Sequence, residues 1–276
     1  MTELPLASIL ALNIRTEVAF GMYSDGCTAA AFHSASSGFL AQNWDWKPAQ
    51  GPNLINLNIS IPGRPSISII TEAGIIGKIG LSSAGVGVCL NAIAALGVSH
   101  TKLPVHLTLR AALDWSGELD AAGIAKRIEE RGVASAGHIL LADSTQAFGL
   151  EVSCKDVVPI PKIENVRGGT AVLHSNHYVA DHPGVKLSTN FLSDSPQRLA
   201  RIQELLRSDE GQVTPDEITA WLSDECGFPG SINRDAKSYG GSATLFSIVM
   251  DLRNRRATVR EGKPTSGGET YILQPM

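Results

Sequence analysis

The stretch Tyr23-Ser24-Asp25-Gly26-Cys27-Thr28-Ala29-Ala30, followed by Gln42-Asn43-Trp44-Asp45-Trp46, organises this chain of 276 residues. Two strand-like runs, 28–34 and 38–44, are separated by the small residues Ala35-Ser36-Ser37, and this pattern predicts a β-hairpin. Cys27 then lies at the start of the first strand and Asp45 at the exit of the second. Because these two ends of an antiparallel hairpin are neighbours, we expect Cys27 and Asp45 to lie close together.

Length and composition favour one large domain and narrow the range of partners. A chain of 276 residues with 43% hydrophobic residues can bury one large core. The net charge of −4, without a cluster of Lys and Arg, provides no basic surface for nucleic acid. Four widely spaced cysteines suit a reducing compartment, and polar residues interrupt the apolar N-terminal stretch, which is not typical of a signal peptide. We therefore expect a cytoplasmic protein.

Residues 79–99 carry no charge and are long enough to be mistaken for a membrane span. Glycine and serine residues punctuate this window where a strand-turn-strand unit would need them. The pattern favours a buried sheet element, and we expect no membrane association.

The rest of the chain alternates hairpins with pairs of helices. Helices are predicted over 4–20, with an end near Gly21, and over 104–115, 119–131, 196–207 and 215–224. Strands are predicted over 54–61, 66–71, 137–142, 146–152, 170–175, 243–251, 256–261 and 269–273, with glycine-punctuated strands in 74–92. The absence of a βαβ rhythm favours an α+β layered fold over a Rossmann sheet.

The chemistry centres on Cys27. A free thiol has a pKa of about 8.5 and needs a base at neutral pH, and no histidine stands in a context typical of a Cys-His protease. If the Gly26–Cys27 bond were cut, the new α-amine of Cys27, with a reference pKa of about 7.7–8.0, could serve as that base. Gly26 tolerates the strained backbone that the attack of the thiol on the preceding carbonyl requires. We therefore hypothesise self-cleavage at Gly26–Cys27 and a nucleophilic Cys27.

Other residues would complete this site. Asp45 could accept a hydrogen bond from the new amine, and Asn176, at the end of strand 170–175, is the candidate oxyanion donor. Trp44 and Trp46 flank Asp45 and could wall an apolar acyl pocket or be ordinary core aromatics. The alternatives are a structural thiol for Cys27, a turn residue for Asp45 and a loop-capping amide for Asn176.

Two cofactor interpretations are weaker. The residues His174, His177, His182 and Asp181 suggest a metal, but His-x-x-His at a strand end is not a helical ligand pair. The glycines between 74 and 87 lack the third glycine of a phosphate-binding motif, so strand packing explains them better. We expect neither a metal nor a cofactor.

Six motifs, in order along essentially the whole chain, carry a resemblance to a known family. They are Asp25-Gly26-Cys27-Thr28, Gln42-Asn43-Trp44-Asp45, Gly77-Lys78-Ile79-Gly80-Leu81, Ala84-Gly85-Val86-Gly87, His174-Ser175-Asn176-His177 and Leu245-Phe246-Ser247-Ile248-Val249-Met250-Asp251. The chain resembles the acyl-coenzyme A:6-aminopenicillanic acid acyltransferase (isopenicillin N acyltransferase) family of N-terminal nucleophile (Ntn) hydrolases. The resemblance implies a four-layer αββα sandwich, autocatalytic maturation at Gly26–Cys27 and acyl transfer through an acyl-Cys27 intermediate. Asp45 and Asn176 would be the amine partner and the oxyanion donor.

The resemblance also implies a division of the chain and a set of partners. Residues 1–26 would be the remnant of a longer pro-segment, or α-chain, and residues 27–276 the catalytic domain, with the two cleaved chains associated and a homo-oligomer as an option. The partners would be a small-molecule acyl donor and an amine acceptor in secondary metabolism, with acyl-CoA as a substrate rather than a cofactor. Ser82 stands where relatives commonly show Asn, and with Ser83 it is a candidate substrate contact. The alternatives are an N-acyl amide hydrolase that does not use acyl-CoA, and an inert, binding-only paralogue.

Overall fold

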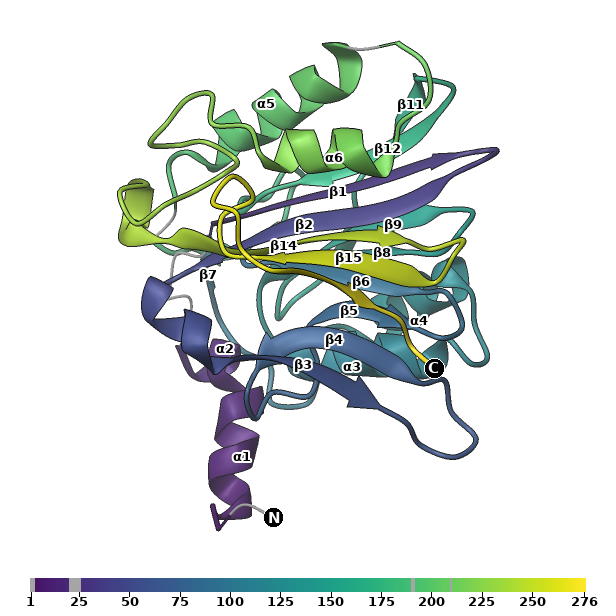
Figure 1. Ribbon diagram of the computed structural model, residues 1–276. Coiled ribbons are helices and arrows are strands. Elements are labelled where there is room, and N and C mark those ends of the chain that lie inside the picture. Colours follow the sequence, from purple (N-terminus) through teal and green to yellow (C-terminus); the bar gives the residue numbers. More distant parts are fainter. Residues whose placement is uncertain (1–2, 20–25, 190–191, 209) are drawn as a thin grey trace.

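The computed structural model describes residues 3–19, 26–189, 192–208 and 210–276. Within these ranges, two large antiparallel sheets lie face to face and helices cover their outer faces (Figure 1). Two short N-terminal helices, α1 (Leu6–Asn13) and α2 (Arg15–Ala19), lie beside the sandwich, and α1 projects away from it.

The first sheet is built around the predicted hairpin. Strands β1 (Gly26–Ser34) and β2 (Gly38–Trp46) pair in a register that places Gly26 opposite Asp45 and Cys27 opposite Trp44. The hairpin prediction is confirmed, and both strands are longer than expected by two residues at this end. The sheet order is β11-β12-β1-β2-β14-β15-β16, with β11 Ile163–Val166, β12 Gly169–His174, β14 Ala243–Asp251, β15 Arg256–Glu261 and β16 Thr270–Leu273.

The second sheet contains the uncharged window, which forms buried strands as predicted. Its order is β10-β9-β8-β6-β5-β4-β3, with β10 Val157–Pro159, β9 Ala147–Val152, β8 Gly137–Ala142, β6 Gly87–Asn91, β5 Ile79–Ser82, β4 Ile67–Glu72 and β3 Leu54–Ile59. The short strands β7 (Ala95–Leu96) and β13 (Lys186–Leu187) form a separate pair. In the part of the chain that the structure describes, no helix has the length and apolar character that crossing a membrane requires.

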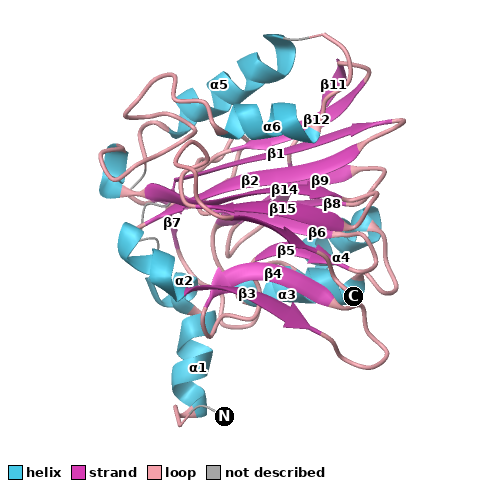
Figure 2. Ribbon diagram, viewed as in Figure 1, coloured by secondary structure: helices cyan, strands magenta, loops and turns pink. Residues whose placement is uncertain are grey.

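Two pairs of helices form the outer layers (Figure 2). Helices α3 (Val105–Trp115) and α4 (Ala121–Arg131) cover the second sheet, and α5 (Ser195–Ser208) and α6 (Pro215–Leu222) cover the first. Thr214 caps α6 by accepting a hydrogen bond from the backbone nitrogen of Glu217, which confirms the predicted helix start. The short 3-10 helices η1 (Pro48–Asn53) and η2 (Tyr239–Gly241) lie in connections.

Three apolar clusters hold these layers together. One lies between the sheets and includes Leu40, Ile70 and Ile248, one lies under α3 and α4, and one lies under α5 and α6. Alternating side chains of β1 and β2 supply both faces of the first sheet, as strand geometry requires. The arrangement is a four-layer αββα sandwich, which confirms the predicted fold class.

The N-terminal helix differs from its prediction over 4–20. It divides into α1 and α2 around Ile14, where the buried side chain of Asn13 binds the loop after β4. Nδ2 of Asn13 donates a hydrogen bond to the carbonyl of Gly74, and its Oδ1 accepts one from the backbone nitrogen of Ile76, both at 2.9 Å. The predicted end near Gly21 lies outside the described residues. The short strands β7, β10, β11 and β13 were not predicted, because two to four residues carry too little alternation to be recognised.

Candidate active site

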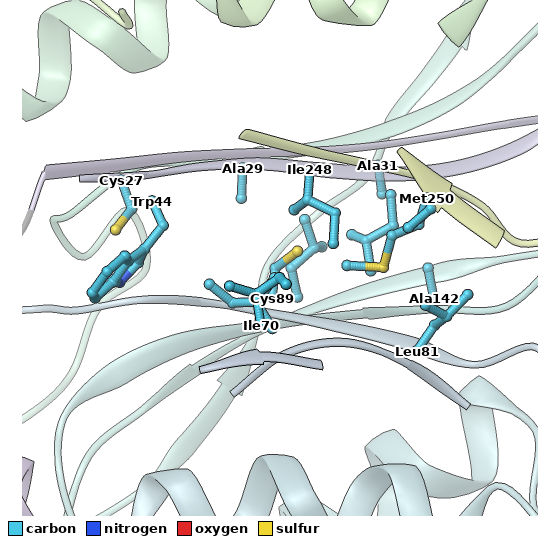
Figure 3. Packing of buried hydrophobic residues seen from close by; sticks show 14 of the residues in the cluster. Cys27, Ala29, Ala31, Trp44, Ile70, Leu81, Cys89, Ala142, Ile248 and Met250 are labelled. Carbon is cyan, nitrogen blue, oxygen red and sulfur yellow. The ribbon is translucent and has the colours of Figure 1, made fainter. Parts of the chain in front are cut away.

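The thiol of Cys27 points into the space between the two sheets. Figure 3 shows it beside the indole of Trp44, its cross-strand neighbour, at one end of the inter-sheet cluster. Only 1% of Cys27 is exposed. Cys89, on β6 of the second sheet, belongs to the same cluster, and burial raises the pKa of its thiol. Cys89 is therefore a neutral thiol of the apolar core. Cys27 differs because its backbone nitrogen and carbonyl also bind polar side chains.

The peptide bond before Cys27 lies against a buried arginine. A Cβ atom built on Gly26 would stand 2.9 Å from Nε of Arg234, so this position has no room for a side chain. Arg234 is fully buried, and it donates hydrogen bonds to Asp194 and to the carbonyl of Tyr239. The guanidinium therefore occupies the outer side of the Gly26–Cys27 junction.

Asn176 contacts the nitrogen of Cys27, but through its oxygen. The backbone nitrogen of Cys27 donates to Oδ1 of Asn176 at 2.7 Å, while Nδ2 of Asn176 donates to the carbonyl of Ala92 at 2.9 Å. The amide of Asn176 has a second hydrogen on Nδ2, which an oxyanion would need. The structure thus brings Asn176 to Cys27, and the roles of both residues, as oxyanion donor and nucleophile, stay predictions.

Asp45 lies on the other face of the first sheet, beside Gly26. Its Oδ1 accepts a hydrogen bond from Oγ1 of Thr244 at 2.7 Å, and its Oδ2 lies 4.0 Å from Nε of Arg234. Complete burial raises the pKa of Asp45 to about 7, although Arg234 and Arg198 act in the opposite direction. Near neutral pH this carboxyl group can therefore gain or lose a proton, and its role toward the amine of Cys27 stays a prediction.

Arg198, Arg234 and Asp194 are site residues that the sequence did not reveal. Nη1 of Arg198 donates to the carbonyl of Cys27 at 2.8 Å, and Nη2 donates to Oδ1 of Asn176 at 2.8 Å. One signal was present for Arg198: it stands on the apolar stripe of α5, between Ser195 and Ile202 at helical spacing. No comparable local signal marks Arg234, which lies in a loop.

The two predicted tryptophans lie in the inter-sheet cluster, near a cavity. Nζ of Lys78 lies 3.9 Å from the centroid of the Trp44 ring, and the ring of Phe246 lies 5.5 Å from it. Phe246 also lines a cavity of about 570 Å³, together with Leu54, Ile70, Leu245 and Tyr271 among others. Trp46 packs into the same inter-sheet cluster. Neither tryptophan lines this cavity, and their role as walls of an acyl pocket stays a prediction.

Ser82 and Ser83 form hydrogen bonds with residues outside the group around Cys27, and their role as substrate contacts stays a prediction. They follow Leu81, which Figure 3 shows at the opposite end of the cluster from Cys27. Oγ of Ser82 accepts a hydrogen bond from Ser116, and Oγ of Ser83 accepts one from the backbone nitrogen of Ser66.

The histidine-rich segment that suggested a metal forms a hydrogen-bond network instead. Nε2 of His174 lies 2.7 Å from Oε1 of Glu151, and Nε2 of His182 lies 3.1 Å from Oε2 of the same carboxylate. Nδ1 of His177 lies 2.8 Å from Oγ of Ser195. Asp181 is exposed. Among the described residues, no group of three or more His, Cys, Asp or Glu side chains could hold a metal ion.

The N-terminal helices cover the second-sheet side of the site. Oε1 of Glu17 accepts hydrogen bonds from the backbone nitrogen of Val105, at the start of α3, and from Oγ of Ser135, at 2.8 and 2.6 Å. A small cavity of about 20 Å³ separates Arg15 and Thr16 from Trp44. This part of the predicted pro-segment therefore lies close to Trp44, the cross-strand neighbour of Cys27.

Solved structures of Ntn hydrolases share this architecture. A Caenorhabditis elegans orthologue of N-acylethanolamine-hydrolyzing acid amidase superposes with a TM-score of 0.61 at 14% identity, covering 90% of this chain and 100% of that chain. Conjugated bile acid hydrolase from Clostridium perfringens gives a TM-score of 0.58 at 10% identity, covering 90% and 92%. Penicillin V acylase from Agrobacterium tumefaciens gives 0.56 at 12%, covering 90% and 86%. The chain thus has the Ntn-hydrolase fold.

Sequence comparison narrows this class to one family. Residues 33–266 match the model of the family described as acyl-coenzyme A:6-aminopenicillanic acid acyl-transferase. The 40 kDa form of acyl-coenzyme A:6-aminopenicillanic-acid-acyltransferase from Emericella nidulans is 38% identical over 277 residues, which cover 98% of this chain and 74% of that protein. The chain belongs to the acyl-coenzyme A:6-aminopenicillanic acid acyltransferase family, as its motifs predicted. It is an enzyme of the acyltransferase and amide hydrolase class.

Proposed function

We propose that this protein is a self-processing acyltransferase that moves an acyl group from an acyl-CoA thioester or an amide to an amine, through an acyl-Cys27 intermediate. The observation that carries the proposal is the convergence of buried groups on one peptide bond. Asn176 and Arg198 contact Cys27, while Asp45 and Arg234 flank Gly26. Such a concentration of buried charge is costly unless it serves chemistry at that bond.

Maturation would begin with the attack of the Cys27 thiol on the carbonyl carbon of Gly26. A carbon–sulfur bond forms, the carbon–nitrogen bond breaks, and the thiol proton moves to the departing nitrogen. Water then hydrolyses the thioester, which releases a carboxylate at Gly26 and restores the thiol. Asp45, with its pKa of about 7, can exchange a proton near the new amine at neutral pH. Residues 1–26 become a separate α-chain that stays associated with residues 27–276.

Turnover would repeat this chemistry on a substrate. The α-amine of Cys27 accepts the thiol proton, the sulfur attacks the acyl carbonyl, and the second hydrogen on Nδ2 of Asn176 stabilises the oxyanion. The amine proton then leaves with the departing thiol or amine. An acceptor amine attacks the acyl-Cys27 thioester, passes its proton back through the α-amine, and regenerates the free thiol.

The substrates follow from the relatives and from the cavity. The similar protein of Emericella nidulans is named for acyl-CoA and 6-aminopenicillanic acid, and the solved structures are named as an N-acylethanolamine-hydrolyzing acid amidase, a conjugated bile acid hydrolase and a penicillin V acylase. We assign the acyl chain to the cavity that Phe246 lines, because the ring of Phe246 lies 5.5 Å from the ring of Trp44, the cross-strand neighbour of Cys27. Acyl-CoA enters this scheme as a substrate and not as a cofactor.

Replacing the nucleophile tests the proposal. In wild-type protein, intact mass and N-terminal sequencing should reveal a chain that begins at Cys27. Cys27→Ala should remain uncut and inactive, whereas Cys226→Ala, at an exposed cysteine, should be cut and active as in wild type. An active wild-type protein without this cleavage would contradict the proposal.

A pure N-acyl amide hydrolase is the second candidate, because this chain shares its fold with an N-acylethanolamine-hydrolyzing acid amidase and with penicillin V acylase. Incubation with acyl-CoA and an amine, compared with incubation of the N-acyl amide in water, separates the two functions. Faster transfer than hydrolysis supports the acyltransferase. A binding-only paralogue would differ from both, because a thiol-reactive acyl probe would then leave Cys27 unlabelled in folded protein.

A further inference from the structure

One buried guanidinium on α5 contacts the nucleophile in two ways. Nη1 of Arg198 donates to the carbonyl oxygen of Cys27 at 2.8 Å and to Oγ1 of Thr28 at 3.0 Å, and Nη2 donates to Oδ1 of Asn176 at 2.8 Å. Arg198 is 0% exposed. The side chain therefore binds both the nucleophilic residue and the amide that holds the nitrogen of that residue.

These contacts are not those of an ordinary ion pair. The carboxylate nearest to Arg198 is Asp194, whose Oδ1 lies 3.7 Å from Nη2, while Oδ2 of Asp194 accepts a hydrogen bond from Arg234. Among the described residues, Nε of Arg198 has no hydrogen-bond partner. An apolar side chain of similar volume could pack here without the cost of burying a charge. The position thus retains a cation whose best hydrogen bonds go to uncharged groups at the nucleophile.

The contact with Asn176 determines which atom of its amide faces Cys27. Oδ1 accepts from two donors, the nitrogen of Cys27 and Nη2 of Arg198, while Nδ2 donates to Ala92. A rotated amide would place its NH₂ group against two donors and its oxygen against a carbonyl. Arg198 therefore keeps an acceptor directed at the nitrogen of Cys27.

We propose that Arg198 is a positioning residue for the N-terminal nucleophile: it fixes the Asn176 amide and the Cys27 carbonyl, and its charge keeps the freed Cys27 amine neutral. This inference rests on the proposed function, because the amine exists only after cleavage. A neutral amine is the form that can accept the thiol proton. Without Arg198, the amine would hold its proton at neutral pH and would lose its fixed orientation.

The electrostatic argument depends on all charged groups around Cys27. A positive charge next to an amine disfavours the ammonium form, whereas carboxylates favour it. The titratable groups that face this site from the surrounding elements are Arg198, Asp194, Arg234, Asp45, His177, Cys89 and Lys78. Burial lowers the pKa of Arg198, but an arginine keeps its proton throughout the neutral range. Asp194 is shared between two guanidinium groups: it accepts a hydrogen bond from Arg234 and lies 3.7 Å from Nη2 of Arg198, so one carboxylate faces two positive charges.

The test compares Arg198→Gln with Arg198→Lys in the full chain. Arg201→Gln is the matched control, since Arg201 lies on the same helix and pairs with Asp224 away from the nucleophile. For each variant, intact mass measures the extent of cleavage, and thermal melting checks the fold. Hydrolysis of an N-acyl amide at a series of pH values gives the pH profile of kcat/KM.

For Arg198→Gln, the acid limb of kcat/KM should move to higher pH by about one unit, with about a tenfold loss of kcat at pH 7 and little change in KM. Arg198→Lys should keep the limb in place, because it keeps the charge, yet lose kcat. Arg201→Gln should behave as wild type. Unaltered limbs in a folded, cleaved Arg198→Gln would overturn the proposal.

If Arg198→Gln does not fold, Arg198→Lys decides, and wild-type kcat in that variant would overturn the positioning role. A folded but uncut Arg198→Gln supports the proposal, because the nucleophile is then misplaced before cleavage. The wild-type protein separates the two levels of inference: uncut, inactive wild type refutes the proposed function, whereas an active wild type with insensitive variants refutes only the role of Arg198.

Discussion

Gly26 has two independent reasons to be glycine. The chemistry of an acyl shift demands backbone freedom, which a glycine provides. The structure adds a steric reason, since a Cβ atom would meet Arg234 at 2.9 Å from Nε and 3.0 Å from Cδ. A residue that the sequence explains by flexibility is therefore also required by tight packing against a buried charge.

The raised pKa of Asp45 predicts that the stability of the folded protein depends on pH. Its pKa is about 7 in the folded protein against an ordinary value of 3.8, so between these values the folded state binds more protons than the unfolded state. Its contribution to the free energy of unfolding should therefore fall as pH rises from 4 to 7, by up to about 4 kcal/mol. Asp45→Asn does not titrate, so its stability relative to wild type should increase between pH 5 and pH 8.

Urea unfolding at pH 5 and pH 8 measures this difference. Asp181→Asn is the control, because Asp181 is exposed and its substitution should change stability equally at both pH values. A constant difference between Asp45→Asn and wild type at the two pH values would show that Asp45 is not titrating in this range.

Strand β5 depends on glycine for its contact with β4. The sequence indicated strand packing for the glycines between 74 and 87, and Gly80 confirms this interpretation, since a Cβ atom there would lie 2.2 Å from the carbonyl oxygen of Ser68 and 2.6 Å from Cα of Ile69. Both contacts are with backbone, which cannot move without shifting the strand. Gly80 therefore sets how closely the two strands pack.

Gly80→Ala should destabilise the protein by about 3 kcal/mol, because overpacking against backbone forces strands apart. Gly51→Ala is the matched control, since nothing lies within 4 Å of a Cβ atom at that position. Its free energy of unfolding should stay within about 0.5 kcal/mol of wild type. Equal midpoints of urea unfolding for the two variants would contradict this account of β5.

The N-terminal segment is bound to the sandwich by buried polar contacts rather than by its apolar residues. Leu6 and Leu10 of α1 are exposed, whereas Asn13 and Glu17 are buried and bond to the sandwich. Arg15, the first residue of α2, forms an ion pair with Glu72. Arg15 and Thr16 also line a small cavity together with Trp44. Apolar periodicity alone thus gives a misleading account of how this segment attaches.

Glu17→Ala should release the segment after cleavage. The substitution removes two hydrogen bonds to a charged acceptor, each worth about 1.5–3 kcal/mol, so retention of residues 1–26 by the catalytic chain should weaken by more than about 100-fold. Size-exclusion chromatography with intact mass of each fraction measures retention. Glu3→Ala, at an exposed residue, should retain the segment. Full retention by Glu17→Ala would assign the attachment to other contacts.

The sequence by itself determined the central hairpin, the layered α+β fold and the family, and it indicated Cys27 as the candidate nucleophile. These features are local, because strand alternation, helix spacing and a Gly-Cys-Thr context are legible within a few residues. It also placed Asn176 near the nucleophile, through the resemblance of its motif. The prediction did not specify which atom of the Asn176 amide faces Cys27. The structure directs the oxygen at Cys27, because Arg198 donates to that oxygen and Ala92 accepts from the amide nitrogen.

Only the tertiary structure decided the charged surroundings of the Gly26–Cys27 bond. Arg198 and Arg234 lie about 170 and more residues from Cys27 in sequence, and they meet it only because α5 and a loop pack on one face of β1 and β2. Local patterns report whether a residue is buried. Which buried charges meet depends on which faces come together, and that is a property of the packed layers.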